Sequence, residues 1–513
     1  MNAVVSTVER VLDPETASVF DQRVDEQAAQ LRAALAAGAF DSSGFAVGLE
    51  LELYAVDDTE RLTRIESSVF GDEYAREIGL HNVECNASPQ PFDPDGCTAQ
   101  AAELRASVAE LRRRLATHEQ QAVCDGMWTV PPAEGSRTYL DTTESHGDIS
   151  VDSHDEVQIA VNMPSKPRYC AMDNHLTRKA GGDITVSVPG ARHQFSTILV
   201  ESLTSSIQPH LQIPATDEFP AYFNAAIRTL GPLLALATNS PFLPADLYNA
   251  VSDPYRLLDD TPHELRIPVF EQTVNGGGHN KACCPRDIET PADIIDRVVD
   301  DWTCGPFLSE WSETPTDEIP SVVAPYWEFT HKYGTYWRWV RAIVGGDATG
   351  DGGSLRIEYR PLPTQPTVED VLSLQWLTVG LIRGIVAADH PLADLPWSDA
   401  EEGFYNAVDE GLEADLYWIT TEGERTRDAA VLYPELFALA RRGLCEQGHT
   451  ESEAETLLAP MVDRFERGET PSQWKKARVR EELDAGASLT DAITTMQRTY
   501  NRHSRHGEPF ARW

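Results

Sequence analysis

The sequence predicts an α+β protein whose sheet is antiparallel. Segments 45–56, 156–163, 205–214 and 354–362 are strand-like, and apolar and polar residues alternate clearly in several of them. Helical patterns lie between these segments, but strand and helix do not follow the strict alternation that a parallel sheet requires. A chain of 513 residues with 41% hydrophobic residues can bury a large core around such a sheet.

The helical patterns divide the chain into three parts. Residues 1–40 hold an amphipathic helix, residues 41–390 hold the strand-like segments, and residues 391–513 continue a helical region that begins at Val368. Within the middle part we expect helices at about 98–122 and 218–237. We expect a helix, a Gly-rich loop and another helix over 168–204. The Pro-, Gly- and Asp-rich stretch 244–325 predicts a long excursion over an active site.

The charge is strongly acidic, with 82 acidic and 42 basic residues and a formal net charge of −40. Only six of the basic residues are lysines, and the acids are spread along the chain rather than gathered in a tail. This pattern favours adaptation to molar salt over the alternative, an acidic surface that binds a partner. Because so acidic a surface repels phosphate backbones, we expect no nucleic-acid partner.

The remaining composition points to a cytoplasmic protein without a membrane partner. No run of 18 apolar residues is present, and the N-terminal segment lacks the basic and apolar regions of a secretory signal. The eight cysteines form no CxxC pair and no zinc-type Cys/His spacing, so reduced thiols are expected.

The first strand carries a pair of acids on one face. Glu50 and Glu52 are two residues apart, so in a strand both side chains point to the same side, about 6.6–6.8 Å apart. Leu49, Leu51 and Leu53 then face the core. Two carboxylates at this separation suit hard divalent cations. The alternative is a half-solvated strand whose acids lie in water.

The last strand carries a stripe of opposite charges. Arg356, Glu358 and Arg360 share one face of segment 354–362. Arginine binds phosphate through two hydrogen bonds, and glutamate can hold the cation that bridges phosphates. The alternative is a ladder of salt bridges between strands.

A third strand-like segment places Gln208, His210 and Gln212 on one face. A lone histidine of this kind is more often structural than a ligand, and Pro209 suggests an edge strand or a bulge. Glu84 adds one carboxylate with little local signal. The motifs GxxxxGK[ST], HExxH and GxSxG are all absent from the sequence. Any ATP must therefore be held by metal ions and arginines on the face of a sheet.

Six motifs in order resemble glutamate–cysteine ligase family 2, the carboxylate–amine ligases of glutamine-synthetase-like fold. They are GLELELY (48–54), KPRYCAMDNHL (166–176), TSSIQPHLQIP (204–214), ALATNSPF (235–242), GTYWRWVRAI (334–343) and SLRIEYRPLPTQPT (354–367). The resemblance covers roughly residues 45–390 and identifies 41–390 as the ligase domain, with a helical C-terminal extension.

The resemblance implies a curved antiparallel sheet of about six strands, with Mg²⁺ ions and the ATP phosphates on its inner face. It implies that Arg360 and Glu358 are catalytic and that Trp337 packs. The implied metal ligands are Glu50, Glu52, Glu84, His210 and Glu358, with Gln208 as an alternative to His210. The implied contacts to ATP or substrate are Arg168, Tyr169, Arg266, Arg341 and Arg360.

The implied reaction is the joining of the glutamate γ-carboxylate to an amine through glutamyl phosphate. In a salt-adapted cytoplasm the product γ-glutamylcysteine could serve as the main thiol, which makes cysteine the favoured amine. The alternatives are another amine or acid, or a non-catalytic relative that acts as a binding protein. Small molecules are the expected partners, and a homo-oligomer is compatible with the sequence.

Overall fold

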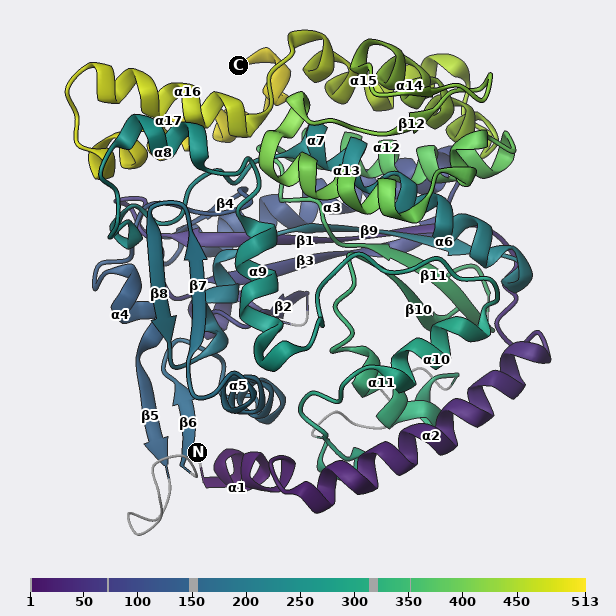
Figure 1. Ribbon diagram of the computed structural model, residues 1–513, viewed down its shortest axis with the longest axis horizontal. Helices are drawn as coiled ribbons and strands as arrows, with labels where there is room; N and C mark the ends of the chain where they lie inside the picture. Colours follow the sequence, from purple (N-terminus) through teal and green to yellow (C-terminus); the bar gives the residue numbers. More distant parts are fainter. Residues whose placement is uncertain (1, 72, 147–155, 313–321, 351) are drawn as a thin grey trace.

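A curved antiparallel sheet lies at the centre of the protein (Figure 1), which is described by a computed structural model over residues 2–71, 73–146, 156–312, 322–350 and 352–513. Within these residues the sheet has seven strands, six of them in the order β10-β11-β9-β1-β3-β2, while β4 pairs with the end of β1. The predicted fold class is therefore confirmed. The strands are β1 (Ala46–Val56), β2 (Tyr74–Arg76), β3 (Asn82–Pro91), β4 (Gln121–Val123), β9 (Ile207–Ile213), β10 (Val340–Gly346) and β11 (Gly353–Tyr359).

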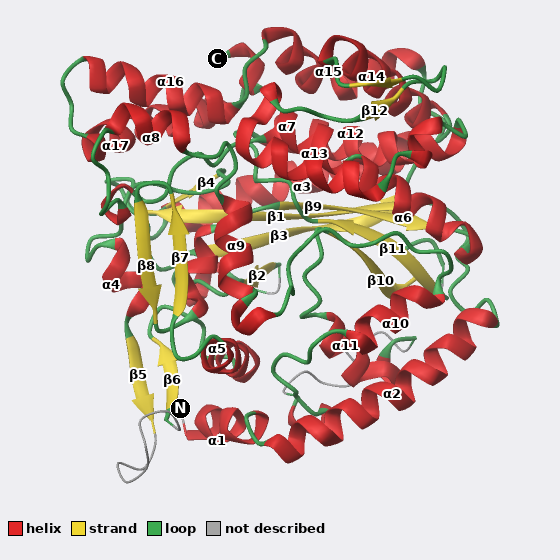
Figure 2. Ribbon diagram, in the orientation of Figure 1, coloured by secondary structure: helices red, strands yellow, loops and turns green. Residues whose placement is uncertain are grey.

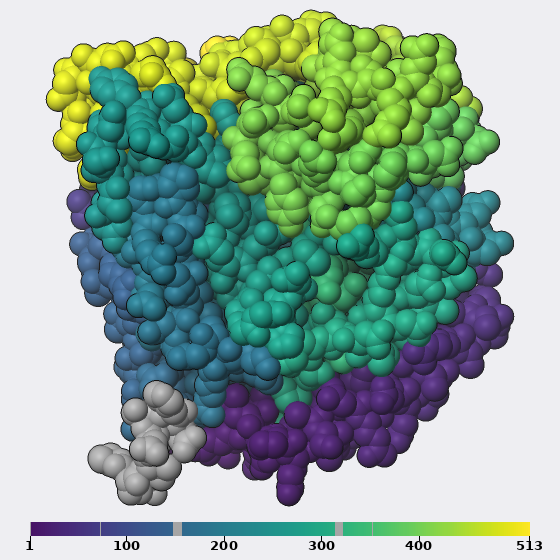
Figure 3. All heavy atoms as spheres, viewed as in Figure 1, coloured from purple at the N-terminus to yellow at the C-terminus, as the bar shows by residue number. Residues whose placement is uncertain are grey.

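Helices cover both sides of this sheet (Figure 2). On one side lie α3 (Pro94–Ala116), α6 (Phe219–Arg228), α7 (Leu230–Ala237), α12 (Val368–Ala387), α13 (Trp397–Glu410), α14 (Ala429–Cys445) and α15 (Glu451–Arg467). On the other side lie α1 (Asn2–Val11), α2 (Pro14–Ala36), α5 (Pro167–Lys179), α9 (Arg266–Val274), α10 (Ala292–Asp300) and α11 (Trp327–Tyr333). The space-filling view places the purple N-terminal helices along one edge and the yellow-green C-terminal helices along the opposite edge (Figure 3).

The alternation of each strand decides which face is core. Leu49, Leu51 and Leu53 are buried in the main hydrophobic cluster together with Leu211 and Ile357 of the neighbouring strands. The acids of β1 therefore point to the opposite, inner face, as the period-two pattern predicts. On that face Glu50 pairs in register with Gln208 and Glu52 with Glu84.

Pro209 lies in an interior strand, although an edge or a bulge was expected. β9 runs between β11 and β1, and Pro209 is paired with Leu49 of β1. The β11 ladder ends at His210, and the next backbone bond on that side runs from Ile207 N to Leu362 O. The proline thus stands at an interruption of the ladder, where its missing N–H is tolerated.

Segment 168–204 corrects one sequence expectation. The first predicted helix is present as α5, but a hairpin of β7 (Ile184–Val188) and β8 (Ala191–Phe195) and a 3₁₀ turn (Ile198–Leu203) stand in place of the second. Ile184 and Val186 are buried on one face of β7, and Gly190 makes the turn at a φ of 75°. Alternation and a left-handed glycine favour a hairpin over a helix.

The remaining elements lie outside the main sheet. A second hairpin pairs β5 (Thr143–His146) with β6 (Val157–Ala160), and a short one pairs β12 (Trp418–Ile419) with β13 (Arg425–Thr426). The other helices are α4 (Ser136–Asp141), α8 (Pro254–Asp260), α16 (Pro471–Asp484) and α17 (Leu489–His506).

Buried ion pairs attach the C-terminal helices to the rest of the molecule. Arg464 of α15 pairs with Asp370 of α12 at 3.0 Å, and both side chains are fully buried. Lys475 of α16 pairs with Asp125 at 2.5 Å and also donates to Asn239 O at 2.7 Å. Among the described helices, α12 alone has the length and apolar composition of a membrane span, and 83% of that span is buried inside the structure, as in a core helix.

Candidate functional site

A cavity of about 230 Å³ lies against the inner face of the sheet. Its lining combines carboxylates, guanidinium groups and an apolar wall, which is the usual mixture in a ligand site. The charged residues are Glu50, Glu52, Glu77, Glu84, Glu201, Arg168, Arg341 and Arg360, the apolar wall is Ile78, Met172, Ile198, Phe270, Val274 and Trp337, and Tyr169, Gln208 and Gly334 complete it.

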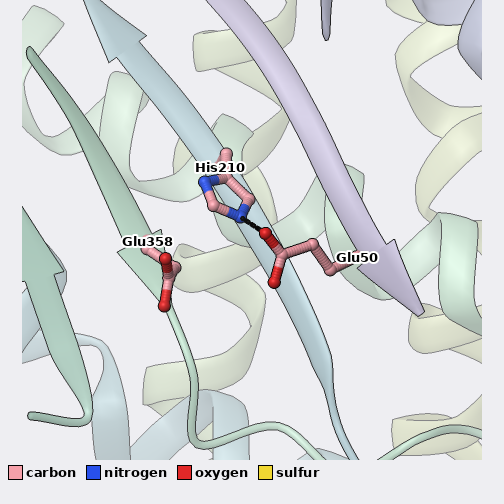
Figure 4. Close-up of side chains that lie close together, drawn as sticks. All are labelled: Glu50, His210 and Glu358. Carbon is pink, nitrogen blue, oxygen red and sulfur yellow. Dashed lines mark ion pairs between the residues drawn. The ribbon is translucent and has the colours of Figure 1, made fainter. Parts of the chain in front are cut away.

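Three neighbouring strands bring Glu50, His210 and Glu358 together (Figure 4). One ligand atom from each lies within 4.8 Å of the others. His210 Nε2 is 3.2 Å from a carboxylate oxygen of Glu50, yet this buried nitrogen has no hydrogen-bond partner in the part of the chain that the structure describes. A nitrogen without a hydrogen-bond partner and two nearby carboxylates together form a donor set that suits a divalent cation.

One contact opposes metal binding through His210 Nε2. Arg356 Nε donates to His210 Nδ1 at 3.3 Å, so in the neutral ring the proton lies on Nε2. A cation at Nε2 requires the proton on Nδ1 instead. Arg356 must therefore release Nδ1 when a cation binds.

Glu358 is already paired with two arginines. Arg341 donates to its two oxygens at 2.7 and 3.1 Å, and Arg360 donates to the first of them. Burial alone would raise the pKa of Glu358, but the two guanidinium groups outweigh it and hold the pKa below its usual range. The charge ladder considered for this strand is thus formed by Arg341 and Arg360 around Glu358. Arg356 turns to His210.

The other carboxylates crowd one another. Burial raises the pKa of Glu84 to about 7 and that of Glu201 to about 8, and neighbouring carboxylates add to both shifts. Burial, with Glu84 beside it, also raises the pKa of Glu77 well above its usual range. A bound cation would favour the ionised forms of these three carboxylates. Their chemistry is therefore that of a site for hard divalent ions.

Glu52 accepts hydrogen bonds from uncharged donors of the protein. Its oxygens accept from Ser206 N at 2.7 Å, from Ser206 Oγ at 3.2 Å and from Gln208 Nε2 at 3.1 Å. Gln208 in turn accepts from Arg360 at 2.5 Å through its own oxygen. Gln208 therefore links Glu52 to Arg360 rather than standing free.

The predicted binding arginines fall into two groups. Arg168 and Arg341 line the cavity, and the Arg168 guanidinium approaches Gly334 so closely that a Cβ there would lie 2.4 Å from Nη2. Within the described ranges Arg168 has no hydrogen-bonded or ionic partner, so it is available to an anion. Arg266 is 3% exposed and lies outside the lining, where it donates to Pro361 O.

Tyr169 lines the cavity, but its hydroxyl donates to the backbone oxygen of Arg76 at 3.0 Å. Trp337, which was expected to pack, lines the cavity and also packs edge-on against Phe270 at 6.3 Å. Sequence reasoning missed Glu77 and Glu201. Glu77 follows the three-residue strand β2, and Glu201 lies in a 3₁₀ turn, so neither has a period-two neighbour that could have marked it.

The profile of glutamate-cysteine ligase family 2 (GCS2) matches residues 46–497. Among curated proteins there is no significant match.

Solved structures that are similar to this chain include the following two. One is the glutamate–cysteine ligase of Francisella tularensis in complex with AMP, with 12% identity, 91% of this chain and 90% of that chain covered, and a TM-score of 0.45. The other is a bifunctional glutathione synthetase of Pasteurella multocida, with 13% identity, coverage of 90% and 52%, and a TM-score of 0.46. Since the family profile spans most of the sequence, this chain belongs to glutamate-cysteine ligase family 2.

Proposed function

We propose that this protein joins the γ-carboxylate of glutamate to an amine, with cysteine as the first candidate, and converts ATP to ADP and phosphate. The observation that carries the proposal is the convergence of carboxylates and guanidinium groups on the inner face of a sheet of this family. The carboxylates suit divalent cations, and the arginines suit phosphate oxygens.

Different residues would bind the metal ions and the anionic groups of such a reaction. Glu50, Glu84, His210 and Glu358 would hold Mg²⁺, which when bound neutralises charge on the transferred phosphoryl group. Arg168, whose guanidinium is unpaired among the described residues, would bind an anionic oxygen of ATP or glutamate. Arg341 and Arg360, held by Glu358, would contact phosphate oxygens on the sheet side.

The chemistry requires activation because an amine attacks a carboxylate poorly. Transfer of the γ-phosphoryl group to the glutamate carboxylate oxygen makes an acyl phosphate, and attack by the amine nitrogen expels phosphate as the amide bond forms. The protein supplies position and charge, and no covalent protein intermediate is needed. The apolar wall of Met172, Phe270 and Trp337 would exclude water that could hydrolyse the acyl phosphate.

The test is a substrate screen in molar KCl with Mg²⁺ and ATP. Glutamate plus cysteine should release ADP and phosphate in step with dipeptide, and each ingredient left out in turn is the control. Release of AMP and pyrophosphate would contradict the acyl-phosphate route. Faster turnover with another amine or acid would change the assigned substrate but not the class of reaction.

A further inference from the structure

Arg266 lies at the start of α9, behind the cavity rather than in it. Its side chain is buried, and its backbone N–H donates to Ser240 Oγ at 3.3 Å. The same helix carries Phe270 and Val274, which form part of the cavity wall. The contacts that hold Arg266 in place therefore also hold the part of the cavity wall that α9 forms.

The guanidinium group joins three parts of the fold. Nη2 donates to Pro361 O, Nε lies 3.5 Å from a Glu264 oxygen, and the group sits over the Trp339 ring at 5.7 Å from its centroid. Glu264 is fully buried and accepts from Asn239 N at 2.9 Å and from Ser240 Oγ. With its carboxylate partner anchored in this way, the guanidinium has one well-defined position.

Pro361 directly follows Arg360, which contacts the inner face of the site. Arg360 N donates to Trp339 O at 2.9 Å, and its guanidinium reaches Gln208 Oε1 and Glu358. Arg266 therefore holds the residue after Arg360 on one side and the tryptophan that binds the Arg360 backbone on the other.

From these contacts we propose that Arg266 is a positioning residue that sets Arg360 for phosphoryl transfer, rather than a residue that touches ATP or substrate. This inference rests on the proposed ligase function. Because Arg266 contacts Pro361 O and does not line the cavity, its replacement should change turnover and not substrate binding.

The test compares Arg266→Met and Arg266→Lys with Arg228→Met. Arg228 is a matched control because it is also a buried arginine, 6% exposed, that pairs with Asp287 and donates to Leu395 O at 3.0 Å, away from the cavity. Arg266→Met should lower kcat about 10- to 100-fold with less than about threefold change in the KM for ATP, because small displacements of a catalytic group cost this much. Arg266→Lys, which keeps the charge and one donor, should recover part of kcat. Arg228→Met should lower Tm and leave kcat unchanged.

Two results would overturn the inference. A large rise in the KM for ATP or glutamate with kcat preserved would make Arg266 a direct contact. Equal kcat for Arg266→Met and the parent, with only Tm reduced, would make it merely structural.

Hydrogen exchange separates this inference from the proposed function. Peptides that cover residues 353–367 should exchange faster in Arg266→Met than in Arg228→Met, measured in the same molar KCl buffer. If the parent releases no ADP with any substrate pair, the proposed function fails, whereas the exchange difference still decides whether Arg266 holds this segment. Unchanged exchange there would reject the positioning role in either case.

Discussion

Each carboxylate in the cavity has its own set of neighbours, and these decide what it can bind. Glu52 accepts from Ser206 and Gln208, and Glu358 accepts from two arginines. Among the described residues, the one ion pair of Glu50 is with His210. Glu50 is therefore more open to a cation than Glu52, while Glu358 contributes charge that is shared with Arg341 and Arg360.

Glu358→Gln tests whether this shared charge belongs to a metal site. The variant keeps the size of the side chain but removes one negative charge, so Mg²⁺ affinity should fall. The rate should drop about 100- to 1000-fold, since each ~1.4 kcal/mol of lost transition-state stabilisation is tenfold. Steady-state kinetics across a Mg²⁺ titration measures both effects.

The matched control for this variant is Glu9→Gln. Glu9 is exposed on α1, and its replacement removes the same charge far from the sheet. If Glu358→Gln behaves like Glu9→Gln and like the parent, the acids of β1 and β11 are only part of a salt-tolerant surface and the metal site is wrong.

His81 provides a pH prediction outside the cavity. It is fully buried between Tyr139 Oη and Ser202 O, each at 3.1 Å, and burial lowers its pKa to about 4. The unfolded chain, with a pKa near 6.5, binds more protons than the folded protein between about pH 4 and 6.5. The stabilising contribution is therefore present above pH 6.5 and is lost as the pH falls toward 4.

Urea unfolding in molar KCl at pH 7.5 and pH 5 measures this loss. The parent should lose about 2 kcal/mol of unfolding free energy more than His81→Gln between the two pH values. His118→Gln, at an exposed site, should keep the pH dependence of the parent. An identical pH dependence in the parent and in His81→Gln would mean that His81 titrates normally in the folded state.

How far single residues of the site could be predicted depends on their local pattern. Glu50, Glu52 and Glu358 alternate with buried leucine, isoleucine and tyrosine, so the strand period alone places them on the face opposite the core. Glu201 could not be found in this way, because a 3₁₀ turn brings it to the cavity by tertiary packing. For the same reason the local pattern could not separate Arg266 from the arginines that line the cavity.

Among the elements, α12 and α14 approach each other unusually closely. A Cβ at Gly384 would lie 1.9 Å from Leu439 O, and a Cβ at Gly443 would lie 1.9 Å from Gly380 O. Because these contacts involve backbone atoms, no side-chain rotation can relieve them. Glycine at these positions lets α14 pack directly against the buried helix α12.

Gly443→Ala should therefore destabilise the protein by roughly 1–3 kcal/mol or more, since the helices must separate. The control is Gly403→Ala in α13, where the nearest atom to a new Cβ is 3.9 Å away. That change should be neutral or stabilising, because alanine favours helix by up to about 1 kcal/mol over glycine. Thermal unfolding measures both variants, and similar Tm values for the two would reject the close-packing argument.

The elements themselves were predictable where one period ran through the whole segment. The strands with charged inner faces and the helices α2 and α3 carry such a period. The hairpin of β7 and β8 was mistaken for a helix because its strands are five residues each and too short for periodicity to decide. The interior place of Pro209 depends on where the ladder to β11 stops, which is a tertiary fact.

Across the whole molecule, lysines contribute little positive charge to the surface. Lys281, Lys332 and Lys475 are buried, so half of the six lysines contribute no surface charge. The arginines at the surface are mostly paired with carboxylates, as in Arg105 with Glu369 and Arg32 with Asp296. A net charge of −40 then leaves many carboxylates without a cationic neighbour, and their mutual repulsion opposes the compact state.

This repulsion predicts that the fold requires salt. The screening length is about 30 Å at 0.01 M and about 3 Å at 1 M, so in dilute buffer carboxylates repel one another across the molecule. We expect Tm to fall steeply on dialysis from molar KCl into dilute buffer, with loss of ADP release, and to recover when KCl is restored. Saturating Mg²⁺ in every sample keeps the occupancy of the cavity constant, and sucrose at equal osmolality separates charge screening from general exclusion of solute. Full stability in dilute buffer, or equal rescue by sucrose, would show that self-repulsion does not govern this protein and that its acids serve another purpose, such as binding a partner.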